Sequence, residues 1–284
     1  MKNTIVKHRM INWHVCLESE YEFFHIMWKK CFSGFQITSS DAISDNINNI
    51  ISITYVNDCY VIKNTEFTSN DKFLIFGIAY EIALNSIYLF SECYTYFHGA
   101  AMLKNEMLFL ILGSTCSGKS TTSALLCMNG YSYLSDDIIP INNETLQVAA
   151  FPKPILIRNN NILYDYKNPD EFFKLFDFRI KTLNSYNKIE SRSPFYPKYV
   201  SSENNSNYYN IQKVFFLERK KNINESLCIP LDLGAAYFEL LKNSHNFNTY
   251  RDNKKIILSI LSNNTIEFYK IQYNTGYEYL NYFI

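Results

Sequence analysis

The chain has 284 residues, 47% hydrophobic and 19% charged, so it is globular and long enough for one sizeable core with a smaller region attached. Its 27 basic and 27 acidic residues balance, and the longest basic run is the "ERKK" of residues 218–221, which argues against nucleic acid as a partner. Seven scattered cysteines without CxxC or Cys/His spacing argue against a disulfide framework and a zinc site, and indicate free thiols in a reducing compartment.

The N-terminal region is expected to contain short strands and turns up to about residue 70. Segments 51–56 and 59–62 are strand-like and flank Asn57 and Asp58, a pair typical of a tight hairpin turn. The first residues lack the apolar segment of a secretory signal, so we expect a cytoplasmic protein. We interpret residues 1–95 as a small N-terminal α/β region and a candidate for substrate recognition.

An apolar segment at residues 73–90 has nearly the length of a membrane span. It carries Glu81, Asn85 and Ser86, which favour a buried or one-sided helix in a soluble core over a transmembrane helix. The preceding "TSND" offers helix-capping residues. The sequence therefore predicts a helix over 71–92 and no membrane partner.

The central segment alternates strand and helix signals. A strand is expected at 96–103 and, after the polar "KNE", a second one at the apolar run 107–112. A helical pattern follows over 119–129, Gly130 ends it, and a strand is expected at 131–135. Further strands are expected at 146–150, 154–158, 211–218 and 265–273, helices at 170–183, 233–243 and 250–262, and a mobile loop at 199–210.

A P-loop pattern, G-x-x-x-x-G-K-[ST], stands between the strand 107–112 and the helix that follows, which is the context it requires. Such a loop wraps a phosphate with its backbone N–H groups, its lysine reaches the outer phosphates, and its hydroxyl ligates Mg²⁺. The sequence therefore predicts ATP and Mg²⁺ as ligands. The predicted nucleotide-binding residues are Gly113, Ser114, Thr115, Cys116, Ser117, Gly118, Lys119, Ser120 and Thr121, with Lys119 also in a catalytic role.

Asp136 and Asp137 end the strand 131–135 in an otherwise apolar stretch, "YLSDDIIPI". A strand–helix–strand unit usually crosses over to a parallel neighbour, so we expect this strand beside 107–112, with both carboxyl ends at the phosphates. Two carboxylates there suit metal binding and acceptance of a proton from a hydroxyl. The alternative is that they only cap a strand end.

Three further side chains are candidates. If 97–103 and 107–112 pair across the polar turn, His98 falls opposite residue 112, at the aspartate end of the sheet; the alternative is an ordinary core or surface histidine. Lys153 and Arg158 follow the aspartates and are candidates to neutralise phosphate charge; the alternative is a pair of exposed strand charges.

The stretch "HGAAM...LILGSTCSGKSTTSALLCMNGYSYLSDDIIPI" resembles the catalytic core of the HPr kinase/phosphorylase superfamily, whose members share a His-Gly pair, a P-loop and an Asp-Asp pair. Here His98 lies 21 residues before Lys119 and Asp136 lies 17 after it, spacings that fit this pattern. "HGAA", "LSDDIIPI", "FPKPILIR" and "VFFLER" are more similar still to the HPr-kinase-like kinases of lasso-peptide and related ribosomal-peptide gene clusters. Those enzymes phosphorylate a serine of a precursor peptide, typically its C-terminal residue.

The resemblance implies that residues 96–284 form a mixed-sheet P-loop kinase core of the HPr kinase/PEP carboxykinase type, acting with ATP and Mg²⁺. It implies that Asp136, Asp137 and His98 serve proton transfer, with Asp136 as the general base. Asp137 would lie on the metal or on His98, and Ser120 with an aspartate, taken here as Asp137, would hold Mg²⁺. The implied partner is a precursor peptide or protein with an acceptor serine, and a homo-oligomer is a further expectation from the family.

Two departures from the family pattern bear on function. No Glu-Thr-Arg-Gly-Leu-Gly signature follows the core, which argues against HPr as the substrate and against the reverse phosphorylase reaction. Cys116 stands where the family usually has glycine, so it affects loop conformation, nucleotide affinity or sensitivity to oxidation, unless it is a tolerated small residue. Three alternatives stay open: an HPr(Ser)-type protein kinase, a kinase of a small hydroxyl metabolite, and a non-catalytic nucleotide-sensing module.

Overall fold

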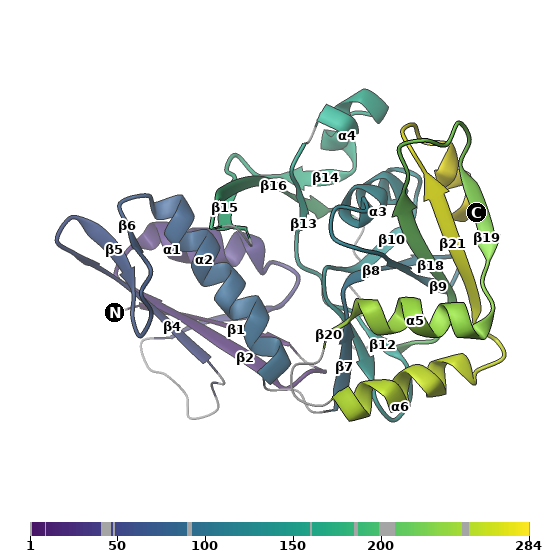
Figure 1. Cartoon of the computed structure of the whole chain (residues 1–284). Coiled ribbons are helices and arrows are strands. Elements are labelled where there is room, and N and C mark those ends of the chain that lie inside the picture. Colours follow the sequence, from purple (N-terminus) through teal and green to yellow (C-terminus); the bar gives the residue numbers. More distant parts are fainter. Residues whose placement is uncertain are drawn as a thin grey trace.

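The computed structural model describes residues 2–8, 10–40, 47, 49–89, 93–159, 161–184, 187–198, 208–245 and 250–283. Parallel and antiparallel strand pairs combine with helices in a mixed α/β fold, as the sequence predicted. Figure 1 shows the N-terminal elements on one side and the P-loop core on the other, with the segment from β13 (Ile155–Ile157) to β16 (Ile189–Pro197) lying between them.

The N-terminal layer, which we define as residues 2–89, has a sheet of its own with strand order β3-β1-β2-β4-β5-β6. The predicted turn at Asn57 and Asp58 is confirmed, since both residues have positive φ (48° and 62°) and Val56 pairs with Cys59. The elements are β1 (Lys2–His8), β2 (Trp13–Ser19), α1 (Glu22–Cys31), β3 (Gln36–Ser40), β4 (Asn49–Val56), β5 (Cys59–Ile62) and β6 (Thr68–Ser69).

The expectation of only strands and turns before residue 70 is wrong at helix α1. Its buried side chains, Phe24, Met27, Trp28 and Cys31, recur at the three- and four-residue intervals of a helix face. Glu22 in the first turn and two lysines in the last also suit the helix dipole. The helical period is therefore present in the sequence of this segment, within the region expected to hold only short strands and turns.

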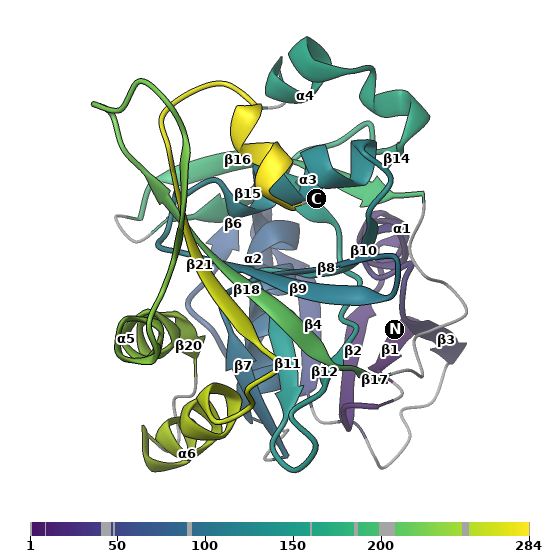
Figure 2. The ribbon, with the colours of Figure 1, turned by 90° about the vertical axis from the view of Figure 1, so that its right-hand side faces the viewer.

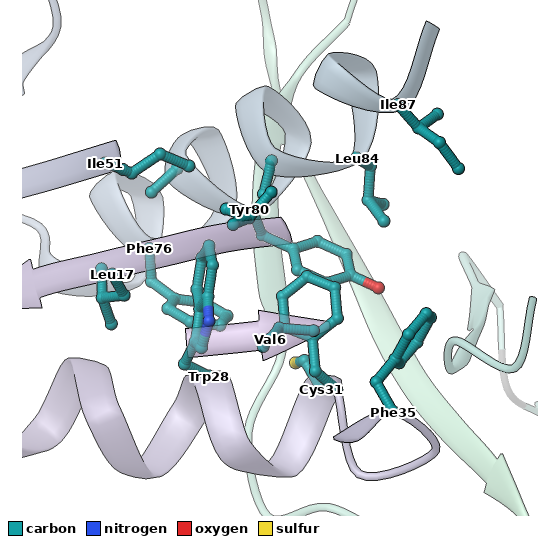
Figure 3. Packing of buried hydrophobic residues seen from close by; sticks show 14 of the residues in the cluster. Val6, Leu17, Trp28, Cys31, Phe35, Ile51, Phe76, Tyr80, Leu84 and Ile87 are labelled. Carbon is teal, nitrogen blue, oxygen red and sulfur yellow. The ribbon is translucent and has the colours of Figure 1, made fainter. Parts of the chain in front are cut away.

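Helix α2 (Lys72–Asn85) with the short η1 (Ser86–Leu89) forms the predicted apolar helix, and Asp71 caps it by accepting from the N–H groups of Phe73 and Leu74. The stretch Lys72–Leu89 has the length and mean hydropathy (1.3) of a membrane span, but 61% of it is buried inside the protein. Its side chains join α1 and the N-terminal sheet in one hydrophobic cluster of aliphatic and aromatic residues (Figure 3). Packing within the protein therefore accounts for its apolar character.

The P-loop core is built on a sheet of order β10-β8-β9-β18-β21-β19. Figure 2 shows β9, β18 and β21 running side by side through this core. Alternate residues of β9 pack into clusters on opposite faces of the sheet, which explains the unbroken apolar run "MLFLIL". The elements are β8 (Gly99–Lys104), β9 (Met107–Leu112), α3 (Lys119–Met128), β10 (Ser132–Asp136), β18 (Ile211–Arg219), β19 (Leu227–Pro230) and β21 (Glu267–Tyr273).

The predicted neighbourhood of β10 and β9 is wrong, because β8 lies between them. The β8–β9 hairpin closes on a two-residue turn at Asn105 and Glu106 (φ 50° and 65°), so β8 occupies one edge of β9 and parallel β18 the other. Since β10 and β9 are both antiparallel to β8, they still run the same way, and their carboxyl ends reach the same edge of the sheet.

The register of this hairpin also differs by one residue from the prediction, because Gly99 and not His98 pairs with Leu112. A second sheet has the order β17-β12-β11-β7-β20, and its strands β7, β12 and β20 are drawn below β8 and β9 in Figure 1. It contains β7 (Tyr94–Phe97), β11 (Ile139–Asn142), β12 (Val148–Ala149), β17 (Tyr208–Tyr209) and β20 (Ser244–His245). The predicted strands at 146–150 and 154–158 are confirmed in shortened form.

The predicted helix at 170–183 is wrong. The chain instead forms the turn η2 (Pro169–Glu171), then β14 (Phe173–Leu175) and β15 (Ile180–Leu183), both paired with β16. The helices predicted at 233–243 and 250–262 are confirmed as α5 (Leu233–Asn243) and α6 (Tyr250–Leu261). The remaining short elements are α4 (Asn161–Tyr166) and η4 (Glu278–Phe283); most of the predicted loop 199–210 lies outside the described residues.

Candidate active site

The phosphate loop runs from the end of β9 to the start of α3, and its tip is exposed at Ser114, Thr115 and Cys116. Gly118 has a φ of 93°, and a Cβ there would collide with the Tyr273 hydroxyl, so both conformation and space require glycine. The first turn of α3 begins directly after it, which leaves backbone N–H groups directed at the loop. This is the geometry of a phosphate site.

Lys119 is nearly buried and folds back over the loop, where its ammonium donates to the carbonyl oxygens of Gly113 (2.8 Å) and Ser114 (3.0 Å). Burial lowers its pKa, while the charges of Asp137 and Asp136 oppose that change. Phosphate oxygens are stronger acceptors than these carbonyls. We therefore expect a bound nucleotide to draw the ammonium from the carbonyls to the phosphates.

Asp136, the last residue of β10, is fully buried, and neither of its carboxylate oxygens makes a hydrogen bond of good geometry. Burial and the neighbouring Asp137 charge raise its pKa to about 7. Lys153, the Ser120 hydroxyl and Lys119 oppose this shift only in part. Asp136 thus faces Ser120 as a buried acid without a full partner.

Asp137 differs from Asp136 in backbone conformation, exposure and ion pairing. It has a φ of 63°, its side chain is 31% exposed, and its Oδ2 accepts from the Lys153 ammonium at 2.8 Å, with Lys153 itself only 1% exposed. Burial tends to raise the pKa of this carboxyl, but Lys153, with His98 and Arg192, lowers it overall. Asp137 is therefore an ionised carboxylate that solvent or a substrate can reach.

The residues around Asp136 fit a magnesium ion. A buried carboxylate with two unpaired oxygens beside a P-loop hydroxyl is the donor set that Mg²⁺ takes together with nucleotide phosphates. Two nearby buried hydroxyls, of Ser117 and Ser135, are also unpaired. Within the described ranges no three His, Cys, Asp or Glu side chains form a metal cluster, so phosphate and water oxygens would supply the other ligands.

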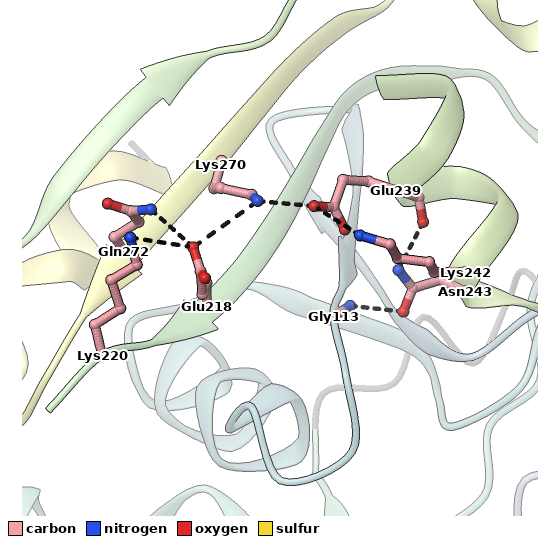
Figure 4. Close-up of polar contacts among 8 residues, drawn as sticks. All are labelled: Gly113, Glu218, Lys220, Glu239, Lys242, Asn243, Lys270 and Gln272. Carbon is pink, nitrogen blue, oxygen red and sulfur yellow. Dashed lines mark hydrogen bonds and ion pairs between the residues drawn. The ribbon is translucent and has the colours of Figure 1, made fainter. Parts of the chain in front are cut away.

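His98 lies at the predicted end of the sheet, in the bend between β7 and β8. Its ring Nδ1 is 3.3 Å from the backbone oxygen of Asp137, so it contacts the aspartate turn through the main chain. Its backbone N–H donates to the Asn243 carbonyl (2.7 Å), and the Asn243 side-chain oxygen accepts from Gly113 N (3.0 Å). Asn243 thus joins the His98 bend to the start of the phosphate loop (Figure 4).

Sequence reasoning missed Asn243. It sits at the end of α5, more than 120 residues from the P-loop motif, and its only signal was an amide at a helix end. A lysine and two glutamates beside it, Lys270, Glu239 and Glu218, link α5 to β21 and β18 through contacts of 2.7 and 3.8 Å (Figure 4). The helix that carries Asn243 is therefore fixed to the same sheet as the loop.

A cavity of about 260 Å³ opens beside the first turn of α3. It is lined by Gly118, Thr121, Arg219, Tyr273, Thr275 and Tyr277. The Tyr273 hydroxyl donates to the Ser117 carbonyl (2.5 Å), and its ring stacks on Tyr279 with centroids 4.2 Å apart. An aromatic-walled cavity next to a phosphate loop suits a nucleoside.

Comparisons with known proteins add one finding. No family model matches the chain, and no curated protein matches it. Among solved structures it is similar to the Hpr(Ser) kinase/phosphatase from Coxiella burnetii, with 14% identity and a TM-score of 0.27 over 64% of this chain and 81% of that chain. A TM-score this low supports no conclusion about function. The chemistry of the site is therefore inferred from the geometry described above.

Proposed function

We propose that the protein is a Mg²⁺- and ATP-dependent kinase that transfers the γ-phosphoryl group to a hydroxyl. The observation that carries the proposal is the division between two adjacent carboxylates beside a P-loop: Asp136 is buried and unpaired, whereas Asp137 is ionised and reachable. A loop that only binds a nucleotide needs neither of these carboxylates. The pair supplies what phosphoryl transfer needs, a metal ligand and a group that orients the attacking hydroxyl.

The geometry favours a different division of labour from the one expected from the sequence. Ser120 approaches Asp136, so Asp136 and Ser120 would hold Mg²⁺, which when bound neutralises charge on the β- and γ-phosphates. Asp137 would orient the acceptor hydroxyl and take its proton, since its carboxylate is accessible and ionised. Lys119 and the loop N–H groups would hold the phosphates.

For the acceptor we propose a serine hydroxyl of a peptide or protein, in particular a ribosomally made precursor peptide. The support is the resemblance of "HGAA", "LSDDIIPI", "FPKPILIR" and "VFFLER" to the lasso-peptide-type kinases. The N-terminal layer, whose helix α2 packs against β15, would then contribute to substrate recognition. A small hydroxyl metabolite and an HPr-type protein remain the competing acceptors.

The test separates the roles of the two aspartates. Wild-type protein with Mg²⁺-ATP and a panel of serine-ended peptides should add one phosphate mass to its substrate. Asp137→Asn should keep Mg²⁺-ATP affinity and lose about 10²- to 10⁴-fold in transfer rate. Asp136→Asn should lose the Mg²⁺-dependent part of nucleotide affinity, and Asp177→Asn, on an exposed surface pair, should match the wild type.

Two results would contradict the proposal. Full transfer by Asp137→Asn would remove that residue from the reaction. Tight Mg²⁺-ATP binding by wild-type protein without transfer to any peptide, protein or small hydroxyl compound would favour a nucleotide-sensing module instead.

A further inference from the structure

Arg158 reaches the phosphate loop from a different element of the core. It directly follows β13, and its Nη1 lies 2.8 Å from the Sγ of Cys116. Cys116 occupies the exposed tip of the loop with a φ of 65°, in the left-handed region. The loop therefore presents this thiol outward, toward the guanidinium.

The guanidinium is not neutralised by its other contacts. Its Nε donates to Glu190 Oε2 at 3.0 Å, and Arg192 donates to the same oxygen at 3.2 Å. Two arginines thus share one carboxylate, which leaves net positive charge at the mouth of the loop. The Arg158 side chain is 46% exposed, so a ligand can reach it.

Arg158 also lies on the segment that fixes the acceptor side of the site. Lys153, five positions earlier, holds Asp137 at 2.8 Å, and the strand between them, β13, packs against α3. One short segment therefore contacts the aspartate that faces the acceptor and the loop that faces the donor. A phosphoryl group under transfer would move between that aspartate and that loop, and this segment touches both.

We propose that Arg158 contacts the phosphoryl group under transfer, exchanging the Cys116 thiol for phosphate oxygens when nucleotide binds. The proposal rests on the kinase function argued above. A thiol is a weak acceptor and a phosphate oxygen a strong one, and the planar guanidinium matches phosphate geometry with two parallel donors. Arg158 would thus act as an arginine finger supplied by the same chain.

The step balances without a further reactant. The bond from the γ-phosphorus to the bridging oxygen breaks, a bond from the acceptor oxygen to that phosphorus forms, and the hydroxyl proton passes to Asp137. ADP leaves with the electron pair of the broken bond. Arg158 takes up the negative charge spread over the equatorial oxygens in the transition state, so its effect falls on turnover more than on nucleotide affinity.

The experiment compares Arg158→Ala and Arg158→Lys with Arg179→Ala, an exposed arginine on the β14–β15 connection whose Nε donates to the Ser193 hydroxyl at 3.3 Å. Basal ATP hydrolysis serves as the readout, which needs no identified acceptor, and ATP dissociation constants are measured alongside. We expect Arg158→Ala to lose about 10³-fold in kcat with less than a fivefold change in Kd, and guanidinium salt to restore part of the rate. Arg179→Ala should match the wild type.

An Arg158→Ala enzyme with kcat within threefold of wild type would overturn the inference while leaving the kinase function intact. A fall in ATP affinity as large as the fall in kcat would also overturn it, because Arg158 would then be a ground-state binding residue. Failure of the wild-type protein itself to bind ATP, or to transfer the phosphoryl group to water or to any tested hydroxyl, would instead contradict the proposed function.

Discussion

The N-terminal layer and the P-loop segment bury different kinds of side chain. Across the described ranges three Lys, Arg, Asp or Glu side chains are buried, Lys119, Asp136 and Lys153, and all three lie within residues 119–153. The largest buried side chains of the N-terminal layer are aromatic and include Trp13 and Trp28. Buried charge is costly and buried aromatic surface is favourable. The buried charges of the chain are therefore concentrated around the candidate site.

The buried histidines of the N-terminal layer differ from Asp136 in that they have hydrogen-bond partners. His8 bonds the Ala150 carbonyl at 2.7 Å, and His25 bonds the Thr4 hydroxyl at 2.8 Å. Burial lowers the pKa of His8 to about 4, so it is neutral at physiological pH. These polar groups are satisfied by the fold, whereas Asp136 is not.

The largest expected effect is a gain in stability when Asp136 is neutralised. Burial raises the pKa of Asp136 to about 7, so between about pH 4 and 7 the folded chain holds a proton that the unfolded chain has released. Stability from this group therefore falls as pH rises through that window. Asp136→Asn should raise the melting temperature of the nucleotide-free protein by several degrees at pH 8 and much less at pH 5.

The comparison at two pH values isolates Asp136, because His8 titrates identically in both proteins and cancels in the difference. Adding Mg²⁺-ATP should reduce or reverse the difference in melting temperature between Asp136→Asn and the wild type. The ion stabilises the ionised carboxylate of Asp136, which only the wild type has. Equal differences in melting temperature between the two proteins at pH 5 and pH 8 would show that the Asp136 carboxylate has a counterion in solution.

The pair Lys153–Asp137 should respond asymmetrically to removal of either partner. Asp137→Ala leaves a buried ammonium unpaired and should lower the free energy of unfolding by about 3 kcal/mol, whereas Lys153→Met leaves a carboxylate that water reaches and should cost less. Urea unfolding measures both. Asp177→Ala, which breaks an exposed pair with Lys30, should cost under about 1 kcal/mol, and equal losses at Asp137 and Lys153 would contradict the assigned burial.

Gly77 tests how the two regions are joined. A Cβ at this position of α2 would collide with the Lys181 backbone carbonyl on β15, and the Lys181 ammonium also pairs with Asp71 at 2.6 Å. Gly77→Ala should therefore lower the free energy of unfolding by about 1–3 kcal/mol and speed proteolysis within residues 2–89. Gly234→Ala, in α5, adds a Cβ that meets only a side-chain oxygen, and should be neutral or slightly stabilising.

The sequence predicted the parts of the site that are local in the chain. The P-loop, the β8–β9 hairpin and the aspartate pair each carry their signal within about ten residues, because glycine turns, apolar runs and helix starts act over that range. The position of β8 between β9 and β10 was not predictable in the same way. It depends on which strand pairs with each edge of β9. One of these edges pairs with β18, which is about a hundred residues away in the sequence.

Contacts between distant segments also explain what was missed at the site. Asn243 bonds Gly113 across 130 residues, and Tyr273 bonds Ser117 across 156, so neither has a motif of its own. Which aspartate faces Ser120 depends on the turn after β10, where Asp137 takes a positive φ of 63°. Residue type and spacing predict that both carboxylates lie near the P-loop, whereas the different surroundings of the two carboxylates depend on the backbone turn.

The smallest expected effect concerns Tyr273, which contacts the phosphate loop and lines the cavity beside the first turn of α3. Tyr273→Phe removes the hydroxyl that donates to the Ser117 carbonyl, so it should lower the free energy of unfolding by about 1 kcal/mol and weaken ATP binding several-fold. Tyr282→Phe is the matched control. The Tyr282 hydroxyl also donates to a backbone carbonyl, that of Ser226 (2.6 Å), which does not belong to the phosphate loop. This control variant should cost similar stability and leave ATP affinity unchanged. If both variants bind ATP like the wild type, Tyr273 supports the fold of β21 and does not shape the loop for phosphate.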